Sequence, residues 1–377
     1  MSVAPLMTDA LTKVVPDVAV ERLNVGAYRI PTDAPESDGT IEWDSTTIVV
    51  VEALAGNERG LGYAYADASA AHVIEGTLAG VVVGRDAMAV PGAWLAMVRS
   101  VRNIGRPGIA SSAISAVDVA LWDLKARLLG VSLAALLGPV RDGVPLYGSG
   151  GFTSYDIEHL ERQLADWTLG GISKVKMKVG REPKRDPERV AAARAAIGPD
   201  AELFVDANGA YERKQALALA ERFAQERVTW FEEPVSSDDL AGLRLLRDRV
   251  PAGMAIAAGE YGYALEYFRR MLEAGAVDVL QADVTRCGGI TELLRVSALC
   301  AAHEVPLSAH TAPSIHAHAC CAIAPLIHVE YFHDHVRVER ELFDGVLAPT
   351  SGKLIPDLTR PGLGLELRRP DVDKHAL

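Results

Sequence analysis

The chain has 377 residues, enough for a (β/α)₈ barrel of about 250 residues together with a smaller domain. Hydrophobic residues make up 49% of the sequence and charged residues 23%, which is the balance of a globular protein and excludes a disordered one. The net charge of −12 argues against nucleic-acid binding and against an anionic membrane surface, because both attract basic patches.

The first residues and the cysteines indicate where the protein works. Residues 1–15 lack a basic stretch followed by an apolar one, so we expect no secretory signal. No run of the sequence approaches the ~18 uninterrupted apolar residues of a membrane span. Four cysteines without a CxxC pair are too few for a disulfide framework and are typical of a reducing compartment. We therefore expect a cytoplasmic protein, most simply an enzyme.

The N-terminal third of the chain is strand-like and then helical. Residues 18–54 have the β-branched composition of strands, with an expected loop at 31–44 that is rich in Pro, Asp and Gly. Apolar residues spaced by three and four predict a helix over 112–129, with Ser111 or Ser112 as its N-cap.

A Leu-Gly-Pro sequence marks a domain boundary near residue 140, after which short apolar runs alternate with helical stretches. Eight strands alternating with helices predict a closed parallel barrel. The eight runs are 144–149, 172–179, 201–206, 228–232, 254–260, 277–283, 305–310 and 326–330.

The last charged or imidazole residues of these runs recur at the length of one strand-helix unit. In a barrel of this kind the carboxyl ends of the strands meet at one mouth, where active sites form. Charges at successive strand ends, in phase with the repeat, therefore predict one functional site. The residues are Lys178, Asp206, Glu232, Glu260, Asp283, His310 and Glu330.

Three carboxylates on adjacent strands predict a metal site. Asp206, Glu232 and Glu260 offer hard oxygen ligands, which suit Mg²⁺. No His or Cys belongs to this group, which argues against zinc. Side chains alternate along a strand, so only one of Glu232 and Glu233 faces the mouth, and the pattern alone leaves that choice open.

Two further pairs have the residue types of proton-transfer chemistry. Lys176 and Lys178 point to the same face of one strand, where each lowers the pKa of the other, so one can act as a neutral base. Lys174 has the same parity, so a basic rim is the alternative. Asp283 and His310 end neighbouring strands, and a carboxylate on one imidazole nitrogen fixes the tautomer for acid or base work at the other.

Other catalytic motifs are absent from the sequence, including GxxxxGK[ST], a full GxGxxG, HExxH and GxSxG. A histidine-rich stretch resembles a metal cluster. Its spacing does not bring the side chains together on one helix face, so we interpret these histidines as packing and surface residues. They are His316, His318, His328, His333 and His335.

Eight segments together resemble the enolase superfamily, mandelate racemase subgroup, over nearly the whole chain. They are AVDVALWDLKARLLGVSLAALLG (116–138), KMKVG (176–180), VDANGAY (205–211), WFEEPV (230–235), AAGE (257–260), ADVTRCGGIT (282–291), SAH (308–310) and HVEYFHD (328–334). The resemblance implies an α+β capping domain over residues 1–140 and a (β/α)₇β barrel over 141–355. It also implies that the tail, 356–377, returns to the capping domain.

The resemblance also implies site roles. It selects Glu232, with Asp206 and Glu260, for Mg²⁺, and it makes Lys178 the base of one face with Lys176 as its helper. Asp283 and His310 match the dyad of the other face, where the muconate-lactonising branch would carry a lysine at 283. Glu330 matches an acidic residue that hydrogen-bonds the enolate oxygen, and Asn208 matches a polar neighbour of the metal site.

The implied chemistry is removal of the α-proton of a carboxylate substrate through an enediolate. The polar loop around Arg29 and Trp43, which we expect to contact substrate, favours a polyol over a phenyl group. We therefore expect an acid-sugar dehydratase, a carbon-oxygen lyase giving a 2-keto-3-deoxy acid. A racemase or epimerase of a 2-hydroxy acid is the alternative, and a non-catalytic binding barrel a remote one. We also expect a homo-oligomer, between a dimer and an octamer.

Overall fold

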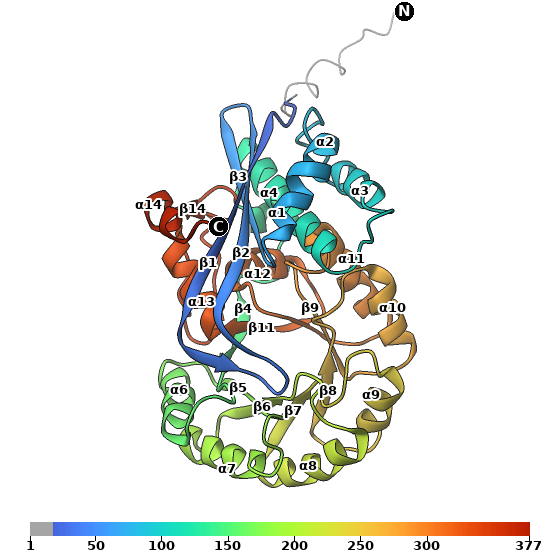
Figure 1. The fold of residues 1–377 in the computed structure, drawn as a ribbon, viewed down its shortest axis with the longest axis vertical. Coiled ribbons are helices and arrows are strands. Elements are labelled where there is room, and N and C mark those ends of the chain that lie inside the picture. The colour runs from blue at the N-terminus through green and yellow to red at the C-terminus, as the bar shows by residue number, and fades with distance from the viewer. Residues whose placement is uncertain (1–17) are drawn as a thin grey trace, which may run out of the picture.

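The computed structural model describes residues 18–377, and it shows a capping domain at one end of a barrel (Figure 1). The predicted absence of a secretory signal concerns residues outside this range. The eight-stranded closed parallel barrel with its N-terminal capping domain confirms the predicted fold class.

The capping domain begins with a three-stranded antiparallel sheet, β1 (Arg22–Ser37), β2 (Glu42–Ala55) and β3 (Glu58–Tyr65). The loop predicted over 31–44 is therefore wrong for most of its length. A register shift between Pro31 and Glu36 absorbs the irregular sequence, and pairing resumes with Glu36 opposite Trp43. A tight turn remains between the strands.

Helices cover one face of the capping sheet. They are α1 (Ser69–Val73), α2 (Ala79–Val82), α3 (Val90–Ser100) and α4 (Ile109–Leu128), with a π-helical segment at Ile74–Leu78. A Cβ on Gly62 would lie 2.2 Å from the Ala116 carbonyl oxygen, so this glycine allows β3 to approach α4.

The predicted serine N-cap of α4 is wrong, because the helix begins at Ile109 after Gly108. Ser111 and Ser112 lie buried inside the helix. Ser111 Oγ instead donates to the Tyr263 carbonyl, 2.7 Å away in the barrel.

The barrel strands run in sequence order around the ring, and parallel pairing of β11 with β4 closes it. Every predicted apolar run overlaps one of these strands. They are β4 (Val144–Gly150), β5 (Lys174–Lys178), β6 (Glu202–Asp206), β7 (Val228–Glu232), β8 (Ala255–Ala258), β9 (Val279–Ala282), β10 (Leu307–Ala309) and β11 (Leu326–Phe332).

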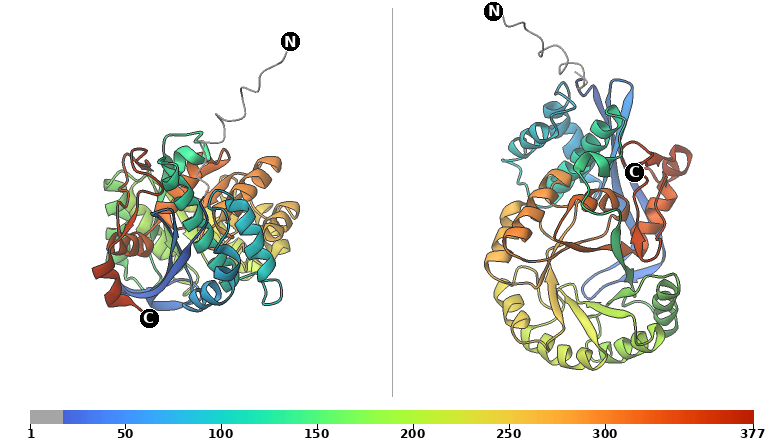
Figure 2. Two further views of the ribbon diagram at one scale, coloured as in Figure 1. Left: turned by 90° about the horizontal axis from the view of Figure 1, so that it is seen from above. Right: turned by 180° about the vertical axis from the view of Figure 1, so that it is seen from behind.

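Helices form the outer layer of the barrel (Figures 1 and 2). Their apolar faces pack on the outer side of the strands and form the main core with it. They are α6 (Ile157–Leu169), α7 (Asp186–Ile197), α8 (Arg213–Gln225), α9 (Leu240–Arg247), α10 (Leu265–Glu273), α11 (Gly289–Ala302), α12 (Pro313–Ala319) and α13 (His333–Leu342). The short helix α5 (Leu133–Leu137) precedes the barrel.

Aromatic side chains fill the barrel interior below the polar strand ends. Tyr147, Phe204 and Trp230 are buried there together with Ala257 and Val279. The Phe204 and Trp230 rings stack with their centroids 5.2 Å apart. These side chains pack the barrel interior and support the residues at the carboxyl ends of the strands.

The last segment of the chain returns to the capping sheet. It contains β12 (Phe343–Asp344), β13 (Lys353–Leu354), β14 (Glu366–Leu367) and α14 (Arg369–Val372). The Leu377 amide donates to the Ala27 carbonyl of β1 at 3.0 Å, and Arg369 forms an ion pair with Glu52 of β2. The domain limits at 140 and 355 stay predictions.

Candidate active site

A cavity of about 410 Å³ lies between the barrel mouth and the capping sheet. From the barrel it is lined by Lys178, Asn208, Glu260, His310 and Glu330 among others. From the capping domain it is lined by residues of β2 and by the residues at the end of β3. Four of the seven strand-end residues singled out in the sequence, Lys178, Glu260, His310 and Glu330, therefore line one cavity.

The three predicted metal ligands lie together in this region. Asp206 and Glu232 are the last residues of β6 and β7 and are register partners, and Glu260 follows β8. One carboxylate oxygen from each lies within 4.8 Å of the other two, and all three side chains are buried. Glu260 Oε2 has no hydrogen-bond partner among the described residues. This all-oxygen set of three buried carboxylates fits a hard divalent cation.

The two adjacent glutamates of the Glu-Glu-Pro sequence differ in their surroundings. Glu232 Oε1 lies 2.6 Å from Lys176 Nζ, and its Oε2 accepts from Trp230 Nε1 at 2.9 Å. Glu233 has a φ of 37° and lies outside the carboxylate cluster. Burial, then Glu260 and Asp206, raise the pKa of Glu233 well above its usual value. The geometry therefore favours Glu232 as the ligand.

The two lysines are held by carboxylates. Lys176 Nζ lies 2.6 Å from Glu232, 2.9 Å from Glu330 and 3.3 Å from Asp206. Lys178 Nζ lies 2.5 Å from Asp206 Oδ2. Burial and Lys176 lower the pKa of Lys178, but Asp206, Glu260 and Glu232 together raise it above the ordinary value. The expectation that mutual repulsion makes one lysine neutral is thus wrong here, because the carboxylates outweigh that repulsion.

Asp283 and His310 form a buried dyad. His310 Nδ1 lies 2.8 Å from Asp283 Oδ2, and Asp283 Oδ1 accepts from the Thr285 amide at 2.6 Å. His310 Nε2 is directed toward Glu260 Oε2 at 3.2 Å. Burial lowers the pKa of His310, but Glu260, Glu330 and Asp283 together raise it above the ordinary value. The protonated imidazolium is therefore favoured.

Glu330 and Asn208 complete the predicted set. Glu330 Oε2 accepts from the Thr311 amide at 3.2 Å, and Lys176 and His310 hold the pKa of Glu330 low against the effect of burial. Asn208 has a φ of 45°, its amide donates to Asp206 Oδ1 at 2.9 Å, and its Oδ1 is buried without a partner in the described chain. Both line the cavity.

The two expected substrate contacts differ. Trp43 lines the cavity, and its Nε1 donates to Glu36 Oε2 at 2.8 Å. Arg29 lies exposed on β1 opposite Thr47 and is not among the residues lining the cavity.

The sequence did not predict that Arg286 and His335, the latter interpreted as a packing or surface residue, line the cavity. Arg286 Nη1 lies 3.3 Å from Glu260 Oε1, and its Nε lies 3.6 Å from Asp283 Oδ2. Arg286 lies three residues after Asp283, a carboxylate at a strand end, and this spacing could have indicated that Arg286 belongs to the site. His335 stacks on Tyr65 of the capping domain, and this contact between distant segments leaves no pattern in the sequence. Burial lowers the pKa of His335 to about 3, which favours the neutral ring.

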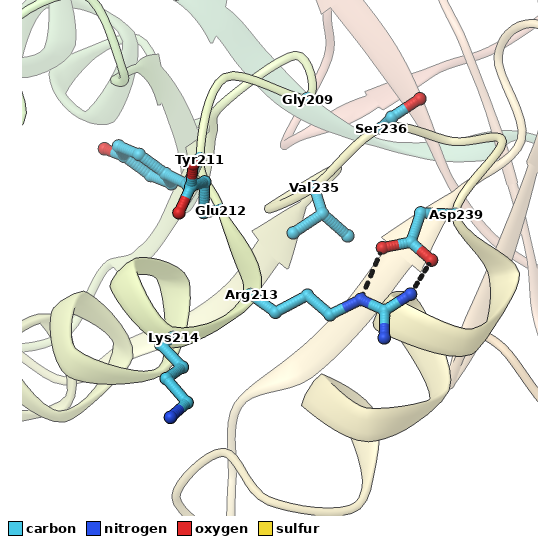
Figure 3. A pocket seen from close by; sticks show the side chains of 8 residues that line it. All are labelled: Gly209, Tyr211, Glu212, Arg213, Lys214, Val235, Ser236 and Asp239. Atoms are coloured by element: carbon cyan, nitrogen blue, oxygen red, sulfur yellow. Dashed lines mark hydrogen bonds and ion pairs between the residues drawn. The ribbon is translucent and has the colours of Figure 1, made fainter.

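A second hollow, of about 450 Å³, lies outside the site (Figure 3). Two of its charged residues are paired with each other, since Arg213 Nε donates to Asp239 Oδ2 at 2.7 Å. Figure 3 shows Lys214 pointing away from this pair. None of the predicted site residues lines it.

Over residues 18–377, no helix has the length and apolar character needed to cross a membrane.

Two family descriptions match the chain. Residues 27–138 match "Mandelate racemase / muconate lactonizing enzyme, N-terminal domain", and residues 159–372 match "Enolase C-terminal domain-like". A solved mandelate racemase/muconate lactonizing enzyme-like protein from Rubrobacter xylanophilus has 59% sequence identity and a TM-score of 0.94. The match covers 95% of this chain and 100% of that one.

Two curated relatives have named reactions. A 3,6-anhydro-alpha-L-galactonate cycloisomerase from Streptomyces coelicolor is 33% identical over 359 residues, 92% of this chain and 97% of that protein. An L-talarate/galactarate dehydratase from Salmonella typhimurium is 32% identical over 296 residues, 76% of this chain and 73% of that protein. Its structure liganded with Mg and L-lyxarohydroxamate has a TM-score of 0.87 and 26% identity, covering 100% and 96% of the two chains.

Proposed function

The chain belongs to the mandelate racemase and muconate lactonizing enzyme family of the enolase superfamily, and we propose that it dehydrates an acid sugar. In this proposal the enzyme removes the α-proton of a sugar carboxylate and expels the β-hydroxyl as water. The resulting enol becomes a 2-keto-3-deoxy acid by tautomerisation.

The observation that carries the proposal is the position of Lys178 and His310. They come from β5 and from the end of β10, and both line the one cavity that Glu260 and Glu330 also line. Dehydration needs a base at the α-carbon and an acid at the departing hydroxyl. Lys178 is the candidate base. His310, whose raised pKa favours the imidazolium, is the candidate acid.

The remaining polar residues position these two. Asp283 binds His310 Nδ1 and so leaves Nε2 directed into the site. Lys176 binds Glu232 and Glu330 at once, and this holds the two acidic side chains in place from inside the barrel. We assign both Lys176 and Asp283 as positioning residues for the proton transfers.

The cofactor in this proposal is Mg²⁺, with Asp206, Glu232 and Glu260 as the residues that would hold it. A bound Mg²⁺ supplies positive charge that makes the α-proton of a carboxylate more acidic, and it competes with Lys178 for the Asp206 carboxylate. Support for this choice comes from the all-oxygen ligand set and from the magnesium in the related dehydratase structure.

A polyol is the substrate class that the cavity lining supports best. Hydroxyl and carboxylate groups line the wall formed by the capping domain, and they can hydrogen-bond the hydroxyls of a sugar chain. These groups belong to Asp38, Ser45, Thr46, Thr47, Tyr65 and Asp67.

A cycloisomerase is a second candidate. The cycloisomerase from Streptomyces coelicolor supports it, because the match spans 92% of this chain and 97% of that protein. The first step is the same α-proton removal. The leaving group would then be a ring oxygen, which stays in the product, so no water is released. A racemase is a third outcome of the same two-sided site, in which His310 returns the proton to the opposite face.

The test is an NMR time course in deuterated water with Mg²⁺ and a library of mono- and diacid sugars, their lactones and their anhydro forms. A dehydratase gives a 2-keto acid that is one water lighter than its substrate. A cycloisomerase gives an isomer of its substrate without loss of water, apart from deuterium incorporation, and a racemase gives α-deuteration without a keto product. Absence of α-proton exchange across the whole library would contradict the proposal and favour a binding role.

A further inference from the structure

We propose that Asp33, Glu36 and His333 form a second cation site, which binds Zn²⁺ and joins the capping strand β1 to the barrel. One ligand atom from each of the three residues lies within 4.8 Å of the other two. The group is distinct from the carboxylate cluster of Asp206, Glu232 and Glu260, and no step of the proposed dehydration uses it.

The fold brings the three residues together from distant segments. Asp33 lies in the part of β1 where pairing with β2 is interrupted, between Pro31 and Glu36. His333 is the first residue of α13, directly after the barrel strand β11. Its Nε2 lies 3.0 Å from Asp33 Oδ2. Ser154 of the barrel donates to the Pro35 carbonyl at 2.6 Å, which holds the irregular segment against the barrel.

An unsatisfied oxygen is the independent sign of a ligand. Glu36 is fully buried, and its Oε2 accepts from Trp43 Nε1 at 2.8 Å. Its Oε1 has no hydrogen-bond partner among the described residues. A buried carboxylate oxygen without a partner is costly and uncommon, and a bound cation would satisfy it.

One divalent cation would balance the charge of the group when Glu36 is ionised. Asp334 is next to His333 but is already paired, because Arg337 Nη2 lies 2.6 Å from Asp334 Oδ1 and Thr46 donates to its other oxygen. Arg337 lowers the pKa of Glu36 through its charge, but no ion pair joins these two side chains in the described part of the chain. With a neutral imidazole, Asp33 and Glu36 leave two negative charges, which one divalent cation balances.

Without a cation the group would hold a proton instead. Burial, followed by Asp334 and against the hydrogen bond from Trp43, raises the pKa of Glu36 to about 9. Zn²⁺ binding would release that proton, as is usual when a metal occupies a site whose ligands must be deprotonated.

The ligand types favour Zn²⁺ over Mg²⁺. Zn²⁺ accepts one imidazole nitrogen and two carboxylates with a water in the fourth position, whereas Mg²⁺ prefers oxygen alone. Two bonds of about 2.0 Å at a tetrahedral angle separate their ligand atoms by about 3.3 Å, close to the 3.0 Å between Asp33 and His333. The chain thus carries one site for each kind of cation.

The position suggests what the cation would do. Glu36 binds Trp43, and both Trp43 and Phe332, the residue before His333, line the substrate cavity. A cation held by β1 and by the start of α13 would fix the capping strand over the cavity. The site would therefore stabilise the closed arrangement of the two domains.

The test measures Zn²⁺ binding to the full chain in excess Mg²⁺, by equilibrium dialysis with metal analysis, and locates the ion by anomalous diffraction at the zinc edge. We expect one Zn²⁺ per chain between Asp33, Glu36 and His333. We expect His333→Gln or Asp33→Asn to weaken it by at least ~10-fold, since each removes a ligand.

His375→Gln is the matched control. His375 Nε2 lies 2.8 Å from Glu341 Oε1, so it is also a histidine paired with a carboxylate, but it belongs to no group of three ligands. This variant should bind Zn²⁺ like the wild type. The proposal fails if no anomalous peak lies at the site, or if the His333 and His375 variants bind equally. Either result would mean that Asp33 and His333 form only an ion pair, and that the neighbouring Glu36 is protonated.

Discussion

The ammonium group of Lys178 lies 2.5 Å from Asp206 Oδ2, so the candidate base and a candidate metal ligand are bonded to each other. The protonation of Lys178 therefore depends on what else binds Asp206. We expect Mg²⁺ to lower the pKa of Lys178, because the cation and the ammonium compete for the same carboxylate. We also expect Asp206→Asn to lower it in metal-free protein.

Carbon-13 NMR of labelled lysine side chains measures this pKa directly. Lys174, which pairs with Glu202 on the rim, is the internal control and should respond little to Mg²⁺. An unchanged Lys178 titration on adding Mg²⁺ would show that the pair does not couple metal binding to the base.

The second prediction separates the two glutamates of the Glu-Glu-Pro sequence. Glu232→Gln should weaken Mg²⁺ binding by more than ~100-fold, because it replaces a ligand in the carboxylate cluster. Glu233→Gln should cost less, because Glu233 lies outside that cluster. Calorimetric titration with Mg²⁺ measures both, and the reverse order would exchange the two roles.

Chelator should abolish activity in the wild type, and added Mg²⁺ should restore it.

Much of this site could be predicted from the sequence alone. Residues that end successive strands, spaced by the length of one strand-helix unit, meet at one end of the barrel. Asp206, Glu232 and Glu260 end consecutive strands, so their phase along the chain predicts their meeting at the mouth. The wall formed by the capping domain could not be predicted in this way. Trp43 with Glu36, and Tyr65 with His335, are contacts that depend on how the two domains dock, and no local spacing encodes them.

The same distinction explains why two predictions are wrong: the loop over residues 31–44, and the lowering of a lysine pKa by the neighbouring lysine. Pro31 is a turn-forming residue, but antiparallel pairing across β1 and β2 outweighs that local preference. The two lysines were interpreted from their mutual repulsion alone. Their pKa values depend on carboxylates that β6, β7 and β11 bring beside them.

The third prediction concerns stability and pH. Glu339 of α13 is buried and accepts from Tyr63 of the capping sheet at 2.6 Å, and burial raises its pKa to about 7. The folded state therefore binds a proton that the unfolded chain releases near its ordinary pKa. The stability from this group is present at low pH and is lost as the pH rises from about 4.5 to 7, by about 3 kcal/mol.

Glu339→Gln should flatten this part of the pH dependence of the unfolding free energy, as measured by urea denaturation between pH 5 and 7.5. Glu341→Gln on the same helix is the control. The pKa of Glu341 is lowered, mainly by His375 and Lys374 against a burial effect, so its contribution changes below this window. Parallel curves for the wild type and the Glu339 variant would contradict the prediction.

The fourth prediction compares two residues of the capping domain. Trp43→Ala should change the order of preferred substrates, because Trp43 lines the cavity, while Arg29→Ala should leave that order unchanged. Neither should alter Mg²⁺ affinity, since neither belongs to the carboxylate cluster. Relative kcat/KM values over an acid-sugar panel measure the effect. Equal changes in both variants would mean that Arg29 reaches the substrate when the site is occupied.

The last prediction separates the two sides of the active site. Lys178→Ala should reduce α-proton exchange by ~10²–10⁴, the usual worth of a general base. His310→Asn should act differently, because His310 is the acid of the proposed dehydration and not its base. The variant should lose formation of the 2-keto acid yet keep exchanging the α-proton, since Lys178 and the metal ligands are unchanged.

One NMR time course per substrate resolves these outcomes, since it reports exchange, keto product and configuration together. In a racemase, His310→Asn would instead exchange one enantiomer, fail with the other and give no keto product. His316→Asn is a useful control, because His316 is buried nearby on α12 but its Nδ1 is bonded to the Thr311 carbonyl at 2.7 Å. Wild-type rates in both the Lys178 and the His310 variants would contradict the two-sided site, because each group would then be dispensable for proton transfer.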